Sequence, residues 1–246
     1  MIDRSLVRLA LAGLLMMVSG WLHAASGGAL MQAGNDLGDR ASLQRGAQLY
    51  MNYCAGCHSL KYLRYSRMAQ DLGLSEEQVQ ASLNFSGAPV GEHITTVMPA
   101  QAEKWFGKLP PDLTLISRVR GNDWIYTYLQ SFYQDEEAAL GWNNALFPDV
   151  SMPNALWELQ GLQRLRGERD ALPEVIDASH LERVADGALT APQFDQAARD
   201  ITNFLAYAAE PAALKRQSMG IWVILFLVVF TLLAWLLKQE YWKDVH

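Results

Sequence analysis

Two cysteines and a histidine stand together in Cys54-Ala55-Gly56-Cys57-His58, and the chain contains no other cysteine. Two thiols at this spacing can meet the two vinyl groups on one edge of a porphyrin, and the adjacent imidazole can then reach the iron from one side. The motif therefore predicts one covalently attached haem c, bound through Cys54 and Cys57, with His58 as the proximal ligand of the iron.

Three other chemistries use the same residue types. Two cysteines in an exported protein often form a disulfide, and Cys-x-x-Cys alone is typical of a thioredoxin-like redox pair. A closed zinc site needs four ligands, but outside the motif and the first 25 residues only His93, His180 and His246 remain, none paired at ligand spacing. The histidine directly after the second cysteine favours haem over these alternatives.

A sixth, distal ligand is expected because a haem that only carries electrons has both axial positions filled, and methionine raises its potential relative to a second histidine. Among the nine methionines, Met98 and Met152 remain as candidates, since the others lie in the end segments or too close to the motif. Each precedes a proline, which favours extended backbone and can present a side chain from a loop. These observations leave the choice open, and at least one of the two is then an ordinary core methionine.

Two amphipathic helices are predicted to position the motif. Ser42–Tyr53 leads into it, with Ser42 as the N-cap and apolar residues recurring at three- and four-residue spacing. Gly46 inside this helix costs about 1 kcal/mol relative to alanine, which a close crossing with another helix would explain. Phe194–Ala209 has the same periodicity and ends at Glu210-Pro211. We expect these helices to cross, as the N- and C-terminal helices of small c-type cytochromes do.

The N-terminal segment, residues 1–25, has the pattern of an export signal. Arg4 and Arg8 form a weakly basic start before a 14-residue apolar stretch, Leu9–Leu22, and Ala24 or Ala25 provides a small residue for cleavage. Fourteen residues are too few to span a bilayer comfortably, so a signal peptide is favoured over an uncleaved N-terminal anchor.

The C-terminal segment contains Met219–Leu237, 19 residues without a charge. As a helix it would be about 28 Å long, close to the ~30 Å hydrocarbon core of a bilayer, and aromatic residues near both ends suit the membrane interface. Basic residues flank it equally, so orientation depends on the export signal. The predicted organisation is a signal peptide (1–25), a periplasmic haem c domain (26–214), a transmembrane helix (215–238) and a cytoplasmic tail (239–246).

Charge argues against binding to nucleic acid. The whole chain has a formal net charge of −6, and Ala25–Leu214 carries 14 Lys plus Arg against 23 Asp plus Glu, a net charge of −9. Nucleic acids require a basic face, whereas this domain would attract a basic protein partner. Asp135-Glu136-Glu137 is a candidate for steering such a partner, the alternative being an ordinary solvated charge run.

Four segments resemble the cytochrome c1 family, in the family's order along the chain: Cys54–Arg64, Leu109–Gly121, Phe147–Gly161 and Phe204–Arg216. The resemblance covers nearly the whole chain after the export signal. This family provides the haem c subunit of the quinol–cytochrome c reductase. The resemblance implies a mainly α fold: a class I-like cytochrome c domain with long loop insertions, plus one C-terminal transmembrane helix. Gly167–Pro192 matches little of the family, and its polarity suggests a surface excursion.

The resemblance also implies roles for single residues. Met152 matches the distal methionine of the family, in preference to Met98. Arg120 matches an arginine that pairs with a haem propionate, although a solvated surface arginine is the alternative. Pro111 stands where its carbonyl can accept a hydrogen bond from the second nitrogen of His58 and so orient that ring.

The expected function is transfer of single electrons from a Rieske iron–sulfur protein to a c-type cytochrome, within a respiratory complex that includes cytochrome b. The expected location is the bacterial cytoplasmic (inner) membrane. This role needs no catalytic acid or base in the chain itself, and enzyme activity would belong to the assembled complex. The alternative is a haem-based periplasmic catalyst or sensor with a labile sixth ligand. A single haem motif and a methionine ligand count against that alternative.

Overall fold

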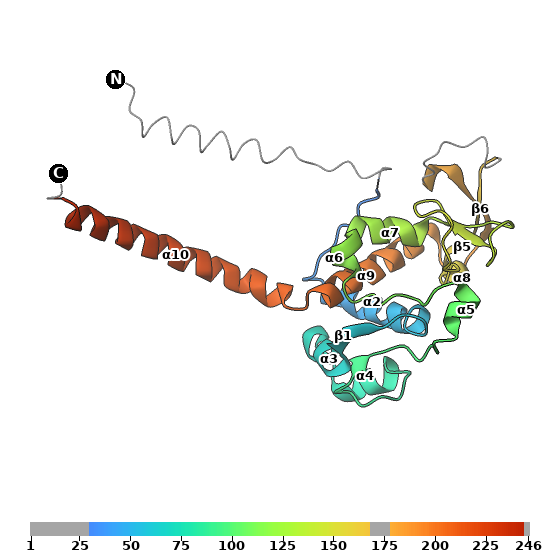
Figure 1. Cartoon of the computed structure of the whole chain (residues 1–246), viewed down its shortest axis with the longest axis horizontal. Helices are drawn as coiled ribbons and strands as arrows, with labels where there is room; N and C mark the ends of the chain where they lie inside the picture. Colours follow the sequence, from blue (N-terminus) through green and yellow to red (C-terminus); the bar gives the residue numbers. More distant parts are fainter. Residues whose placement is uncertain (1–29, 168–177, 244–246) are drawn as a thin grey trace, which may run out of the picture.

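The computed structural model describes residues 30–167 and 178–243, so the expected export signal and part of the surface excursion lie outside the described residues. Figure 1 shows a mainly helical domain from which one long helix projects. The expected mainly α fold with one C-terminal apolar helix is confirmed.

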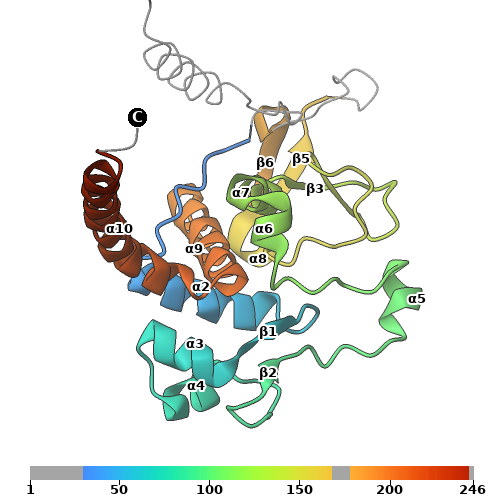
Figure 2. The ribbon, with the colours of Figure 1, turned by 60° about the vertical axis from the view of Figure 1, so that its left-hand side comes forward.

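Two helices, α2 (Arg40–Tyr53) and α9 (Ala191–Ala209), cross at the centre of the domain (Figure 2). They meet at Gly46, where an added Cβ would lie only 2.0 Å from the backbone oxygen of Asp200. Beside this contact, the rings of Tyr50 and Phe204 pack with centroids 5.6 Å apart, and both side chains are fully buried. The crossing predicted from the glycine and the helical periodicity is therefore confirmed.

The predicted N-cap of α2 is wrong. The helix begins at Arg40 and is capped by Asp39, whose Oδ1 accepts a hydrogen bond from the backbone N–H of Ser42 at 3.0 Å. Ser42 is inside the helix, and its hydroxyl donates to Oδ1 of Asp200 at 2.7 Å. The Ser42 hydroxyl therefore links α2 to α9, a contact that the local sequence does not predict. Likewise α9 begins at Ala191 rather than at Phe194. Thr190 precedes it and forms a capping box with Gln193, the third residue of the helix.

Replacing Gly46 with alanine will destabilise the domain, because the new methyl group would collide with backbone that cannot move without opening the crossing of α2 and α9. Overpacking of this kind costs ~2 kcal/mol, which lowers the melting temperature of a domain this size by about 4–8 °C. Thermal unfolding followed by circular dichroism will measure the effect. Gly91→Ala is the matched control, because a Cβ at Gly91 meets nothing within 4 Å. Equal melting temperatures for the two variants would contradict the close crossing.

The remaining elements surround the crossing. On one side lie β1 (Leu60–Arg64), paired antiparallel with β2 (His93–Ile94), and the helices α3 (Tyr65–Leu72) and α4 (Glu76–Ser82). On the other side lie α6 (Ile116–Arg120) and α7 (Asn122–Gln130), both in contact with α9. The helix α5 (Ala102–Phe106) stands apart on the long connection between these two halves (Figure 2).

Two short antiparallel hairpins complete the domain. They pair β3 (Phe132–Gln134) with β4 (Trp142–Asn144), and β5 (Gly161–Leu165) with β6 (Leu181–Asp186). The short helix α8 (Trp157–Gln160) precedes β5, and a 3-10 turn, Ala178–His180, precedes β6. Part of the expected surface excursion is thus a strand, β6, whose side chains after Leu181 are exposed.

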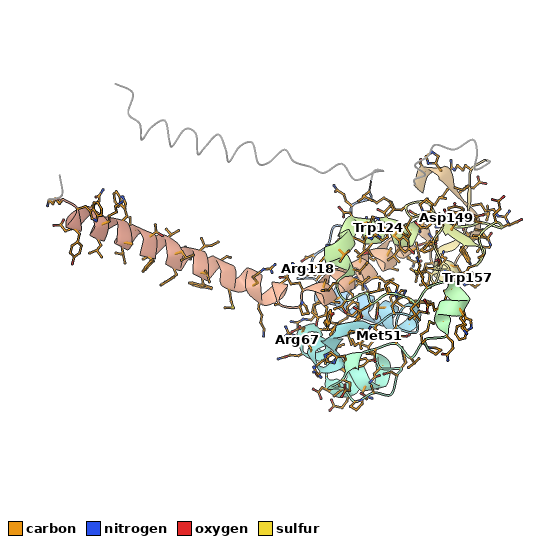
Figure 3. The ribbon with its side chains drawn as sticks, viewed as in Figure 1. Met51, Arg67, Arg118, Trp124, Asp149 and Trp157 are labelled. Carbon is orange, nitrogen blue, oxygen red and sulfur yellow. The ribbon has the colours of Figure 1, made fainter. Side chains whose placement is uncertain are left out.

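The last helix, α10 (Ala213–Tyr241), projects from the domain (Figure 1). Met219–Tyr241 has a mean hydropathy of 2.7 and buries none of its residues, and within residues 30–167 and 178–243 it is the one helix long and apolar enough to cross a membrane. The helix continues past residue 238, where the membrane segment was expected to end. At its base, Glu210 accepts a hydrogen bond from Nη1 of Arg118 at 2.8 Å and also pairs with Arg216. Figure 3 labels Arg118 at this junction.

Candidate haem-binding site

The cysteine motif forms compact turns directly after α2. The backbone N–H of Cys54 donates to the carbonyl of Tyr50, and that of His58 donates to the carbonyl of Cys54, both at 2.8 Å. The two thiols are free and half-buried. Burial raises the pKa of Cys54 to about 12 and also raises the pKa of Cys57. A thioredoxin-like pair needs a thiol with a lowered pKa, so this environment does not favour dithiol redox chemistry.

The ring of His58 is buried and held by one hydrogen bond. Its Nδ1 lies 2.7 Å from the carbonyl oxygen of Pro111. A carbonyl can only accept, so Nδ1 carries the proton and Nε2 keeps a lone pair for a metal. Burial lowers the pKa of His58, which favours the neutral imidazole that metal ions require. The donor set, two thiols and one pre-oriented imidazole, fits a covalently attached haem.

The segment that contains Pro111 is fastened to the strand that follows the motif. The backbone N–H of Leu113 donates to the carbonyl of Ser59 at 2.9 Å. The carboxylate of Asp112 accepts a hydrogen bond from the backbone N–H of Lys61 at 2.8 Å. Hydrogen bonds made by the next two residues, Asp112 and Leu113, therefore hold the Pro111 carbonyl in place against the His58 ring.

The first candidate for a distal ligand, Met98, belongs to a segment that is tied to the motif itself. Its backbone N–H donates to Oγ1 of Thr96 at 3.1 Å, and that hydroxyl donates to the carbonyl of Gly56 at 2.7 Å. The backbone N–H of Thr96 also donates to Oγ of Ser59 at 2.9 Å. Met98 is thus linked, through one threonine, to the loop that carries the two cysteines.

The second candidate, Met152, lies on the side of α7. Its sulfur accepts a hydrogen bond from the hydroxyl of Tyr128 at 3.5 Å. The loop before it is shaped by two buried asparagines of β4: Asn144 accepts from the backbone N–H of Phe147 at 3.1 Å, and Asn143 accepts from that of Asp149 at 2.9 Å. Met152 therefore sits in an ordered loop that is anchored to the α7 and β4 side of the domain.

Arg120 ends α6 beside an aromatic cluster. Its guanidinium lies 4.9 Å from the ring centroid of Trp124 and 5.4 Å from that of Phe147. In the part of the chain that the structure describes, no carboxylate pairs with this exposed arginine. A surface pocket adjoins it, lined by Leu30, Gly34, Asn35, Arg120, Gly121, Asn122, Asp123 and Trp124. Figure 3 labels Trp124 in this region, on α7.

The structure brings the predicted residues together as two groups. Cys54, Cys57 and His58 form one group with Pro111, whereas Arg120 and Met152 are linked through the aromatic residues of α7. Trp124 and Tyr128, whose stacked rings are 4.9 Å apart, were not predicted to take part. Trp124 and Tyr128 are four residues apart on one face of α7, and this spacing is the sequence signal that could have identified them.

Comparison with known proteins identifies the family of the chain. The family model "Cytochrome C1 family" matches residues 35–91 and 87–245. A protein of Allochromatium vinosum named cytochrome c1 is 47% identical over 97% of this chain and 99% of its own length. The cytochrome c1 of Rhodospirillum rubrum is 30% identical over 84% of this chain and 83% of its own length.

A further relative has a different name. The ammonia monooxygenase gamma subunit of Nitrosomonas europaea is 41% identical over 86% of this chain and 86% of its own length. The family assignment therefore depends on the family model and on the relatives named cytochrome c1 rather than on every relative's name. Members of that family transfer electrons through one covalently bound haem c, the cofactor that the Cys54–His58 motif predicts. On this evidence the chain belongs to the cytochrome c1 family.

Proposed function

We propose that this chain is the membrane-anchored haem c subunit of a quinol–cytochrome c reductase. It accepts one electron at a time from a Rieske iron–sulfur protein and passes it to a c-type cytochrome. The observation that carries the proposal is the pre-oriented His58, whose Nδ1 is engaged by the carbonyl of Pro111 at 2.7 Å directly after two free thiols. When bound, haem c supplies a one-electron couple between ferric and ferrous iron.

The protein's contribution at the proximal side is to hold its groups in place before the cofactor arrives. Cys54 and Cys57 would attach the porphyrin, and His58 would present Nε2 to the iron. The Pro111 carbonyl fixes the rotation of the imidazole and increases its basicity, as partners of metal-binding histidines generally do. Tyr50, whose hydroxyl donates to the carbonyl of His58 at 2.8 Å, fastens the same residue to the helix crossing.

Met152 is the proposed distal ligand. The distal ligand must reach the haem face opposite His58, and Met98 is fastened through Thr96 to the loop that bears the cysteines. Met152 instead comes from the α7 and β4 side, independent of that loop. If His58 and Met152 both bind the iron, no coordination position would remain for a substrate, which would favour an electron carrier over a catalyst.

Arg120 is the proposed partner of a haem propionate. A guanidinium forms strong charge-assisted hydrogen bonds with carboxylates. Stacking on Trp124 and Phe147 holds the Arg120 guanidinium without neutralising it. The arginine is therefore positioned and still charged, as a partner for a carboxylate must be.

The acceptor is proposed to be a basic c-type cytochrome. The soluble part of the chain is strongly acidic, and Glu136 and Glu137 are exposed on the turn between β3 and β4. Asp135 of the same turn has a structural task, because it accepts hydrogen bonds from Asn143 at 2.8 Å and from the backbone of Glu137 at 3.1 Å. Steering by the two glutamates would weaken as salt increases.

The proposed location is the bacterial cytoplasmic membrane, with the haem domain in the periplasm and α10 as the anchor. Affinity purification of the full chain in detergent is expected to bring down a b-type haem and an iron–sulfur protein together with quinol–cytochrome c reductase activity. A chain that stops after Ala213 lacks the apolar helix. It should be recovered from the periplasm with its haem and should not support quinol oxidation.

The truncated chain also tests which contacts hold the protein at the membrane. Its recovery in membranes after a salt wash would contradict α10 as the sole anchor, unless cytochrome b retains it. Repeating the experiment in cells that lack cytochrome b separates these two explanations. A full chain purified without b-type haem or iron–sulfur protein, and reactive with carbon monoxide, would instead indicate a haem catalyst or sensor.

A further inference from the structure

The hydroxyl of Tyr128 is directed at the sulfur of Met152. The two atoms are 3.5 Å apart, within hydrogen-bonding distance for a sulfur acceptor. Tyr128 is on α7 and Met152 is 24 residues later in a loop, so this contact joins two separate parts of the fold. Within the described ranges, this sulfur is the one partner recorded for the Tyr128 hydroxyl.

The position of this hydroxyl is tightly determined. The Tyr128 ring stacks on Trp124 with centroids 4.9 Å apart and an interplanar angle of 12°. Its other neighbour is the ring of Phe132, also at 4.9 Å but edge-on at 72°. The carbonyl of Tyr128 accepts a hydrogen bond from Nδ2 of Asn144 at 2.8 Å. The ring and the backbone are both held in place, and together they direct the hydroxyl at the Met152 sulfur.

A thioether sulfur has two lone pairs, so it can bind a metal through one and accept a weak hydrogen bond through the other. We propose that Tyr128 is a positioning residue for the distal ligand, and that its hydrogen bond to Met152 sets the reduction potential of the haem. This inference rests on the proposed function, because it requires Met152 to be the distal ligand.

The direction of the effect follows from the electron density on sulfur. A hydrogen bond withdraws density from the thioether and makes it a poorer donor, which destabilises ferric iron more than ferrous iron. The Tyr128 hydroxyl therefore favours the reduced form. Its removal should make the haem harder to reduce, and the equilibrium constant for reduction should decrease about two- to tenfold, the range expected for one hydrogen bond.

The test is the variant Tyr128→Phe in the intact, detergent-purified complex, measured by redox titration of the c-type haem. Phenylalanine keeps the stack on Trp124 and removes only the hydroxyl. We expect a lower potential, a charge-transfer band from sulfur to ferric iron that is still present, and no binding of carbon monoxide. Tyr207→Phe is the matched control, because it removes another buried hydroxyl, one that donates to Asp71 at 3.0 Å, and should leave the potential unchanged.

The double variant Tyr128→Phe/Met152→Leu isolates the hydrogen bond, because without the sulfur the hydroxyl has nothing to tune. Once Met152 is leucine, adding Tyr128→Phe should cause no further change in the reduction potential. If Tyr128→Phe keeps the parent potential while Met152→Leu loses the charge-transfer band, Tyr128 only packs, and this inference alone is overturned. If Met152→Leu retains the band, Met152 is not the distal ligand, and both the inference and that part of the proposed function are overturned.

Discussion

Replacing Cys54 and Cys57 together with serine is expected to leave no haem on the polypeptide after denaturing electrophoresis. Thioether bonds survive denaturation, whereas axial ligands such as His58 do not hold haem once the fold is lost. These are the only two cysteines in the chain, so no other thiol can replace them. Haem staining of the gel should decrease to background, while an antibody detects the polypeptide itself.

The single variants provide the internal comparison. Each retains one thiol and can form one thioether bond, so partial haem staining is expected from Cys54→Ser and from Cys57→Ser. Both thiols lie in the turns that the backbone of Tyr50 and Cys54 organises, and serine preserves those backbone bonds. Persistent haem staining of the double variant would contradict attachment at this motif.

Replacing Met152 with leucine is expected to open the sixth coordination position of the iron. Thioether sulfur is a weak donor that stabilises ferrous iron, so its loss should lower the reduction potential and allow carbon monoxide to bind the reduced haem. Leucine has nearly the volume of methionine, so the loop anchored by Asn143 and Asn144 should remain folded. Visible spectroscopy and redox titration on one preparation measure both effects.

Met98→Leu is the matched control for this experiment. It should keep the parent spectrum and potential and cost only packing, under ~1.5 kcal/mol for a nearly isosteric change. The backbone contact of Met98 with Thr96 does not involve its side chain and should survive. A carbon monoxide-reactive haem in Met98→Leu, together with a parent spectrum in Met152→Leu, would reverse the assignment of the distal ligand.

The sequence alone is enough to predict features whose cause is local or periodic. The haem motif needs only five adjacent residues, and the resemblance to the cytochrome c1 family depends on short segments in order; that resemblance is confirmed by the family comparison. The periodicity of the two central helices predicts which apolar residues pack in the core, although α9 is buried on every side from Asp200 to Ala209. Gly46 predicts their crossing because only a residue without a side chain tolerates backbone this close. The uncharged run before Lys238 likewise predicts a long apolar helix.

Contacts between distant residues were decided by the tertiary structure. Serine is a common N-cap residue, but the Ser42 hydroxyl donates a hydrogen bond to Asp200 across the helix crossing. Asp39 is the N-cap of α2 instead. The spacing of methionines leaves Met98 and Met152 equivalent. The fold places them differently, because the backbone of Met98 is linked through Thr96 to the motif loop, whereas the Met152 sulfur accepts a hydrogen bond from Tyr128 on α7.

The positioning of His58 has the same origin. Pro111 reaches the imidazole across 53 residues of chain, and no periodicity or local propensity encodes that approach. Local patterns determine which segments become helices and which residues can bind haem. The orientation of each candidate ligand, and the hydrogen bonds that it makes, depend on how those helices and loops pack.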